Sequence, residues 1–168
     1  MLTNVLINEK YLKANSPIPL NFNIDEVATY VKLAEELYVK PLIGGILYEE
    51  LKAQIRGGEI SPENQALLLE IYKLEGFAVA YEALPVIAYH FSEVGVTKGK
   101  SENSDSIDTK ELNYLQQHLR AQVEARKDYL LSWLHNFGGN YPLLVLPQCK
   151  VQPLKEVYKP KNPCTDIK

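Results

Sequence analysis

Four segments of the chain repeat apolar residues at steps of three and four, which is the period of one face of an α-helix. The first segment begins at Asn23, a suitable N-cap, and the third begins at Ser61-Pro62, a strong helix start. The last begins at Asp108, which with Glu111 fits a capping box. The spacing predicts helices near residues 24–39, 42–55, 62–93 and 109–136.

Prolines and glycines interrupt this pattern. Lys40-Pro41 is expected to end or kink the first helix, because proline disfavours α geometry in the residue before it. Gly44-Gly45 indicates close packing against another helix or a kink in the second, and Pro85 predicts a kink in the third.

The segments outside these helices differ in character. Residues 1–22, with two prolines, predict an extended arm with room for one short strand, and residues 95–107 are polar, rich in Gly and Ser, and aperiodic. We expect the loop 96–107 to be mobile in the isolated protein. The sequence therefore predicts an all-α fold: a small helical bundle with an extended N-terminal arm and a Pro-rich C-terminal tail, divided into a helical domain, 1–139, and a tail, 140–168.

Composition and charge fit one globular domain with an unusual tail. The chain has 168 residues, 46% of them hydrophobic, and a net charge of −3. Residues 149–168 hold five lysines against Glu156 and Asp166, a net charge of +3, so the remainder carries −6. A basic tail on an acidic body suggests that the tail meets an acidic surface, although a solvated tail kept soluble by its lysines is the simpler alternative.

The start of the chain lacks the pattern of a signal peptide, and no apolar run reaches the ~20 residues that span a bilayer. We therefore expect a protein without a membrane partner. Cys149 and Cys164 lack partners at metal-ligand spacing, and free thiols in a reducing compartment are expected.

Side chains that carry out catalysis do not converge in this sequence. The residues three positions before His90, His118 and His135 are not glutamates, so no Glu-x-x-His pair of a di-iron bundle is present. No phosphate-binding glycine loop and no nucleophile elbow occurs. The chain is therefore not expected to be an enzyme or to bind a cofactor or metal, although a site completed by another chain stays open.

Paired glutamates and tyrosines are the remaining conspicuous residues. Glu35-Glu36 and Glu49-Glu50 are interpreted as solvated helix faces or contacts for a basic partner, because adjacent helical residues point about 100° apart. The eleven tyrosines suit either protein interfaces or half-buried positions at the rims of a small bundle.

The stretch NFNIDEVATYVKLAEELYVKPLIGGILYEEL, a helix followed by Pro-Leu-Ile-Gly and then Leu-Tyr-x-x-Leu, resembles the N-terminal helices of head–tail connector proteins of tailed phages. GEISPENQALLLEIYKLEGFAVAYEALP and VGVTKGKSENSDSID, followed by a helix, resemble the same group. The likeness covers about residues 20–140 and is greatest to connector, ring or head-completion proteins of phages that infect gut Bacteroidetes, including crAss-like phages.

This resemblance implies a structural neck protein of the virion, made in the host cytoplasm. In such proteins a helical bundle forms a homo-oligomeric ring, typically a dodecamer, as an adaptor between the portal and downstream neck or tail proteins. DNA passes through the ring without sequence-specific binding. The alternative is a helical adaptor that binds a regulatory protein partner as a monomer or dimer.

The tail is the predicted partner-binding segment. Its prolines hold it extended, which lowers the entropy lost on docking. Residues 155–159 are the best candidate for pairing with a strand edge. Removing the chain after Asn140 is expected to leave the bundle nearly as stable but to abolish assembly. The predicted docking residues are Leu144, Leu146, Val151, Leu154, Lys155, Val157, Tyr158, Lys159 and Lys161.

Overall fold

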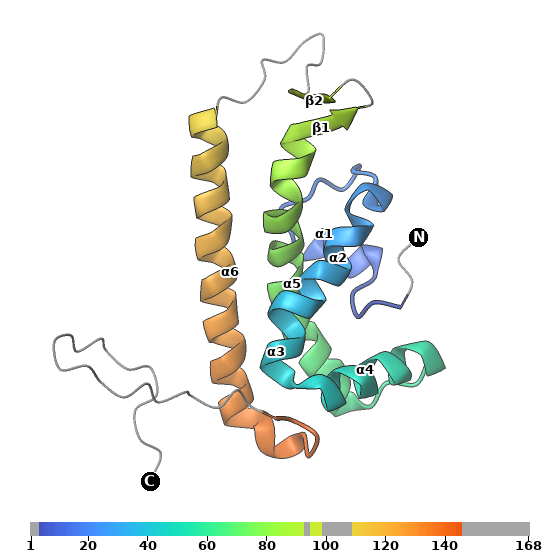
Figure 1. Cartoon of the computed structure of the whole chain (residues 1–168). Coiled ribbons are helices and arrows are strands. Elements are labelled where there is room, and N and C mark those ends of the chain that lie inside the picture. The colour runs from blue at the N-terminus through green and yellow to red at the C-terminus, as the bar shows by residue number, and fades with distance from the viewer. Residues whose placement is uncertain (1–3, 93–94, 99–108, 146–168) are drawn as a thin grey trace, which may run out of the picture.

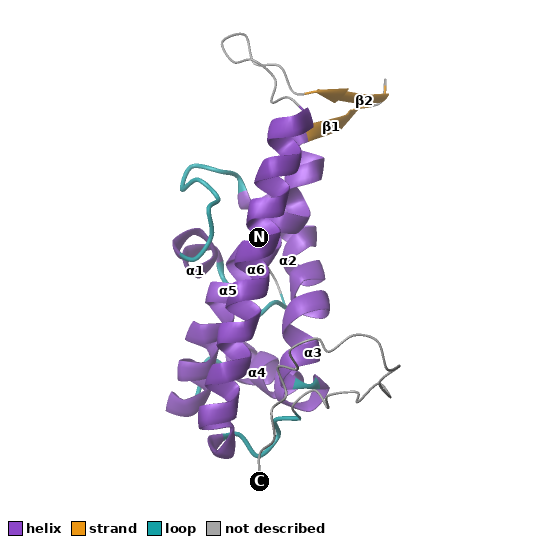
Figure 2. Ribbon diagram, turned by 90° about the vertical axis from the view of Figure 1, so that its left-hand side faces the viewer, coloured by secondary structure: helices purple, strands orange, loops and turns teal. Residues whose placement is uncertain are grey.

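The computed structural model describes residues 4–92, 95–98 and 109–145 of the chain (Figure 1). Within these residues the fold is all-α, as the sequence predicts, with one short β-hairpin added. Figure 2 shows an elongated bundle with the hairpin at one end. The helices, in chain order, are α1 (Glu9–Ala14), α2 (Ala28–Ala34), α3 (Lys40–Ile43), α4 (Gly45–Gly57), α5 (Pro62–Ala88) and α6 (Thr109–Phe137).

Helix α5 is the centre of the bundle. Helix α6 runs antiparallel along one side of it, while α2 and the turns that follow pack on another side (Figure 1). Helix α5 is apolar around much of its circumference, which is typical of a helix enclosed by neighbours. The short helix α1 packs on a further side, where the built Cβ of an alanine at Gly76 would lie 2.4 Å from the Asn15 carbonyl oxygen. Glycine therefore permits this close approach.

The first predicted helix is a succession of helix types. A 3₁₀ turn, η1 (Ile24–Val27), opens it under the cap of Asn23, and a π-turn, η2 (Glu35–Val39), joins α2 to α3. Of the predicted end or kink at Lys40-Pro41, the end is wrong, because the backbone stays helical to Ile43. The wide π-turn lies directly before the proline and accommodates a ring that would crowd a regular α-helix.

The break falls at Gly44 instead. Gly44 has φ 80° and ψ 154°, a conformation open essentially only to glycine, and it separates α3 from α4. The predicted close packing at Gly44-Gly45 is present, but the neighbour is not a helix: Val145, about a hundred positions later in the chain, contacts Gly44.

The third predicted helix is too long by a few residues. Helix α5 ends at Ala88, just after Pro85, and the chain continues as β1 (Tyr89–Ser92). Strand β1 pairs antiparallel with β2 (Gly95–Lys98), Tyr89 opposite Lys98, so the start of the predicted loop is a strand. Aromatic residues favour strands, and the helical period masks this preference in the sequence. Residues 99–107 of the predicted mobile loop lie outside the described residues.

Residues near both limits of the described chain contribute to the core. Residues 4–22 form an arm without a strand among them, but the arm contains α1, which the sequence analysis missed. Val5, Leu6 and Ile7 are buried. At the other end a 3₁₀ turn, η3 (Gly138–Asn140), precedes Tyr141, whose buried hydroxyl donates to the Glu63 carbonyl at 2.7 Å. The expectation that everything after Asn140 lies outside the bundle is therefore wrong.

Candidate functional site

Two carboxyl groups lie in the core of the bundle. Glu35 is on η2 and Glu75 is on α5, and their side chains are 1% and 0% exposed. The interpretation of Glu35-Glu36 as a solvated pair holds for exposed Glu36 but is wrong for Glu35. The signal was present in the sequence, because Glu35 stands four residues after Val31 on the apolar face. Glu75 likewise stands four residues after Ile71.

Glu35 has hydrogen-bond donors from two directions. The Leu6 N–H donates to its Oε1, and the Tyr48 hydroxyl donates to Oε2 at 2.6 Å. Lys52 Nζ lies 3.5 Å from the same hydroxyl. Burial raises the pKa of Glu35, and the bonds from Tyr48 and Leu6 and the charge of Lys52 partly offset this rise. Glu35 is thus equipped to carry the negative charge of the pair.

Glu75 has no such support. Among the described residues, neither of its oxygens accepts a hydrogen bond. Burial raises its pKa far above the ordinary value, and the neighbouring Glu35 charge raises it further. Burial and the Glu35 charge therefore favour the protonated form of Glu75. Removing this proton would leave two charges in an apolar core.

The pair holds the N-terminal arm in place. While the Leu6 N–H donates to Glu35, the Leu6 carbonyl accepts from the Tyr72 hydroxyl at 3.2 Å. The Tyr72 ring stacks on Tyr11 of α1, with centroids 4.8 Å apart. Side chains thus satisfy both backbone groups of Leu6, as a neighbouring strand does in a sheet. Because the carboxyls are closed to solvent, this arrangement is a structural clamp and offers no access to a substrate.

The histidines do not form a metal site within the described residues. His118 and His135 are exposed on α6, and the side chain of His90 lies outside the described set. No cluster of three or more His, Cys, Asp or Glu side chains suited to a metal occurs in the part of the chain that the structure describes. Nor is any helix there long and apolar enough to cross a membrane.

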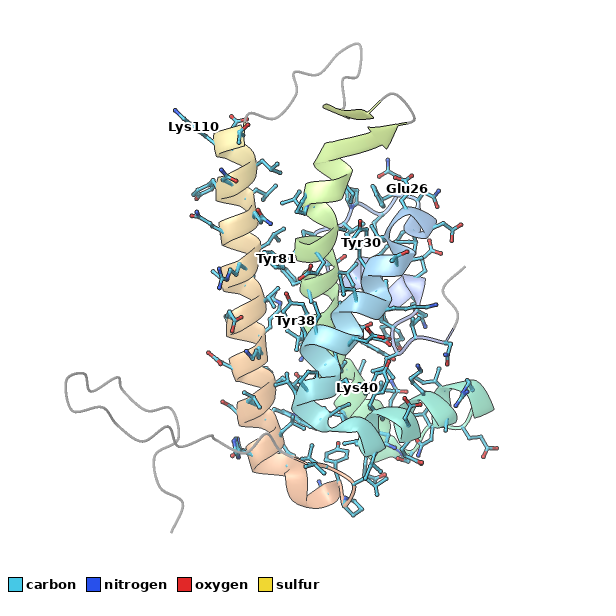
Figure 3. All side chains as sticks on the ribbon, in the orientation of Figure 1. Glu26, Tyr30, Tyr38, Lys40, Tyr81 and Lys110 are labelled. Carbon is cyan, nitrogen blue, oxygen red and sulfur yellow. The ribbon has the colours of Figure 1, made fainter. Side chains whose placement is uncertain are left out.

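Most of the described tyrosines are buried or half-buried. Tyr38 and Tyr81, labelled in Figure 3, line the interior between helices, and the Tyr38 hydroxyl donates to Glu82 at 2.5 Å. Burial and the neighbouring Glu82 carboxylate raise the pKa of Tyr38. The remaining described tyrosines are buried at 48, 72 and 141, half-buried at 11, 30 and 81, and exposed at 114 and 129. This distribution favours the rim interpretation for most of them.

An open pocket of about 340 Å³ lies between α5 and α6. Glu70 and Lys73 line it from α5, and Ala125, Arg126 and Tyr129 line it from α6. It combines two cations with one carboxylate and an exposed aromatic ring. No pattern in the sequence marked these residues, because they come from two helices and lie more than 50 positions apart in the chain.

Only the root of the predicted docking tail is described. Leu144 is half-buried against the core, and Val145 contacts Gly44 while remaining 59% exposed. Ile46, two residues after Gly44, is 64% exposed. The other predicted docking residues lie outside the described residues: Leu146, Val151, Leu154, Lys155, Val157, Tyr158, Lys159 and Lys161.

Residues 39–150 match the model of a family described as "Family of unknown function (DUF6712)". The match spans more than half of the chain, from the end of η2 to just beyond the described tail root, and the protein belongs to this family. No curated protein and no solved structure matches the chain.

Proposed function

We propose that this protein is a structural component of a phage neck, a ring-forming adaptor between the portal and the tail through which DNA passes. The resemblance of its helical segments to head–tail connectors supports this function, and the all-α bundle is compatible with it. The body is acidic, which suits a channel that repels DNA and lets it slide.

The observation that carries the proposal is the anchoring of the tail root. Leu144 and Tyr141 pack on the bundle, and Val145 contacts the backbone at Gly44. The described root of the tail is therefore held at a fixed point beside Gly44. An anchored root loses less entropy when the following segment docks, and basic residues beyond it suit the acidic surface of the portal or the next subunit.

Native mass spectrometry of two chains tests the proposal. The full chain and a chain ending at Val145 are measured alone and with the portal protein encoded by the same phage. We expect a ring of many copies for the full chain, alone or on the portal, and a small species for the shortened one. Circular dichroism of both chains controls for folding.

A full chain that stays a monomer or dimer under both conditions would overturn the ring and favour the adaptor of a regulatory partner. A shortened chain that still forms the ring would instead move the docking function from the tail to the bundle.

A further inference from the structure

Arg126 occupies an unusual environment at the α5–α6 pocket. Its guanidinium carbon lies 3.7 Å from the centre of the Phe77 ring, a close stack that fixes the plane of the group. One terminal nitrogen donates to Gln122 Oε1 at 3.1 Å. The Nε–H is buried and, within the described residues, has no acceptor.

A second cation stands at the same pocket. Lys73 Nζ lies 2.7 Å from both oxygens of Glu70 and 5.7 Å from the centre of the Tyr129 ring. The Lys73 side chain is 48% exposed, so it can turn toward a second anion without leaving the pocket. The pocket thus carries one positive charge in excess, from Arg126.

A buried donor on a charged group without an acceptor is costly, and proteins rarely leave one unpaired. Here the donor belongs to a stacked guanidinium whose half-buried side chain lines an open pocket, so a ligand in the pocket meets this group and reaches Nε once the covering side chains move. We propose that the α5–α6 pocket is a binding site for a carboxylate side chain of a partner protein. Arg126 is its principal donor, Lys73 is its second cation, and Tyr129 forms its wall.

The charge of the pocket favours a carboxylate over a phosphate. A phosphate monoester carries −1.5 to −2 charges, as a general property of that group, and would meet Glu70 inside the pocket. Nucleic acid requires several cations along its backbone, whereas the body of this chain carries an excess of negative charge. A planar carboxylate with a single charge matches the flat guanidinium fork. The inference holds whether or not the protein forms a ring.

The test follows the Nε–Hε NMR signal of Arg126 in the full chain during titration with sodium acetate at constant ionic strength. The signal is assigned by its loss in Arg126→Lys. We expect a saturable shift with acetate, and in Lys73→Gln at least threefold weaker binding. Arg120, exposed on the same helix, provides an internal control whose signal should not saturate.

Three results would overturn the proposal. One is an Arg126 signal that acetate leaves unchanged, and another is an equal shift with chloride, which would show a general salt effect. Tighter binding of inorganic phosphate than of acetate would instead assign the pocket to a phosphate ligand. The Lys73 substitution lies at the surface, so its effect can be read even if changes at Arg126 disturb folding.

Discussion

Glu75 lies beside Glu35 in the core, where burial and the charge of Glu35 favour the protonated form of Glu75. Glu35 accepts hydrogen bonds from the Leu6 N–H of the arm and from the Tyr48 hydroxyl, whereas neither Glu75 oxygen has a hydrogen-bond partner among the described residues. Glu75 on α5 is thus the carboxyl group that favours the protonated form, and Glu35 on η2 accepts the hydrogen bond from the N-terminal arm. We therefore expect the attachment of the arm to depend on the protonation of Glu75.

Replacing Glu75 with glutamine should stabilise the protein at alkaline pH. Because the pKa of Glu75 is raised in the folded state, its contribution to stability is complete below the ordinary glutamate pKa of about 4.3 and is lost as the pH rises toward the folded-state value. Glutamine keeps a donor for Glu35 but has no proton to lose. We expect Glu75→Gln to raise the free energy of unfolding at pH 8 by about 1 kcal/mol or more, since a tenfold change in proton affinity is worth about 1.4 kcal/mol.

Urea unfolding between pH 4 and pH 8 measures this effect as the difference between variant and wild type. Glu124→Gln, at an exposed ion pair with Lys127, is the matched control and should change stability by less than about 0.5 kcal/mol at every pH. A constant difference between Glu75→Gln and wild type across this range would show that Glu75 does not titrate as proposed.

Gly76→Ala should loosen the arm. The added Cβ would lie 2.4 Å from the Asn15 carbonyl oxygen and 2.8 Å from its carbon, so the backbone of the arm must move. We expect a loss of about 1 to 3 kcal/mol, typical of overpacking, together with faster amide exchange at Leu6. Gly57→Ala, at the end of α4 with nothing within 4 Å, should be neutral or stabilising by up to about 1 kcal/mol. Equal stability of the two variants would contradict the close approach.

Gly44→Ala should disturb the junction between α4 and the tail root. The residue has φ 80°, and an added Cβ would lie 3.2 Å from that of Val145. We expect a cost of about 1 to 3 kcal/mol from backbone strain. At the neighbouring Gly45, the nearest atom to a new Cβ is Lys40 Cε at 3.9 Å. Gly45→Ala should therefore leave thermal unfolding almost unchanged, and similar melting of both variants would count against strain at Gly44.

The point of truncation should decide whether the bundle stays stable. A chain ending at Asn140 loses Tyr141, which is buried and lies 5.9 Å from the Trp133 ring, and also loses Leu144. We expect this chain to lose about 2 kcal/mol or more of stability, whereas a chain ending at Val145 should stay within about 0.5 kcal/mol of the full protein. Urea unfolding followed by the fluorescence of Trp133, the only tryptophan, measures both. Equal stability of the two shortened chains would restore the boundary at Asn140.

Local sequence determined the long elements of this fold. The cap at Ser61, where the hydroxyl accepts from the Asn64 N–H, and the apolar period that follows place α5 from Pro62, and similar spacing places α6. These signals can be recognised within one or two helical turns of sequence, because capping hydrogen bonds and side-chain periodicity depend on neighbours three and four residues away.

Tertiary structure alone decided which polar residues are buried and which distant residues meet. Glu35 and Glu36 are the same residue type side by side, yet only Glu35 is buried in the core. The Arg126 pocket and the contact of Val145 with Gly44 join segments far apart in the chain. Sequence periodicity predicts which side of a helix faces the core. The burial and the pKa of a residue on that side depend on which residues of the other helices pack against it.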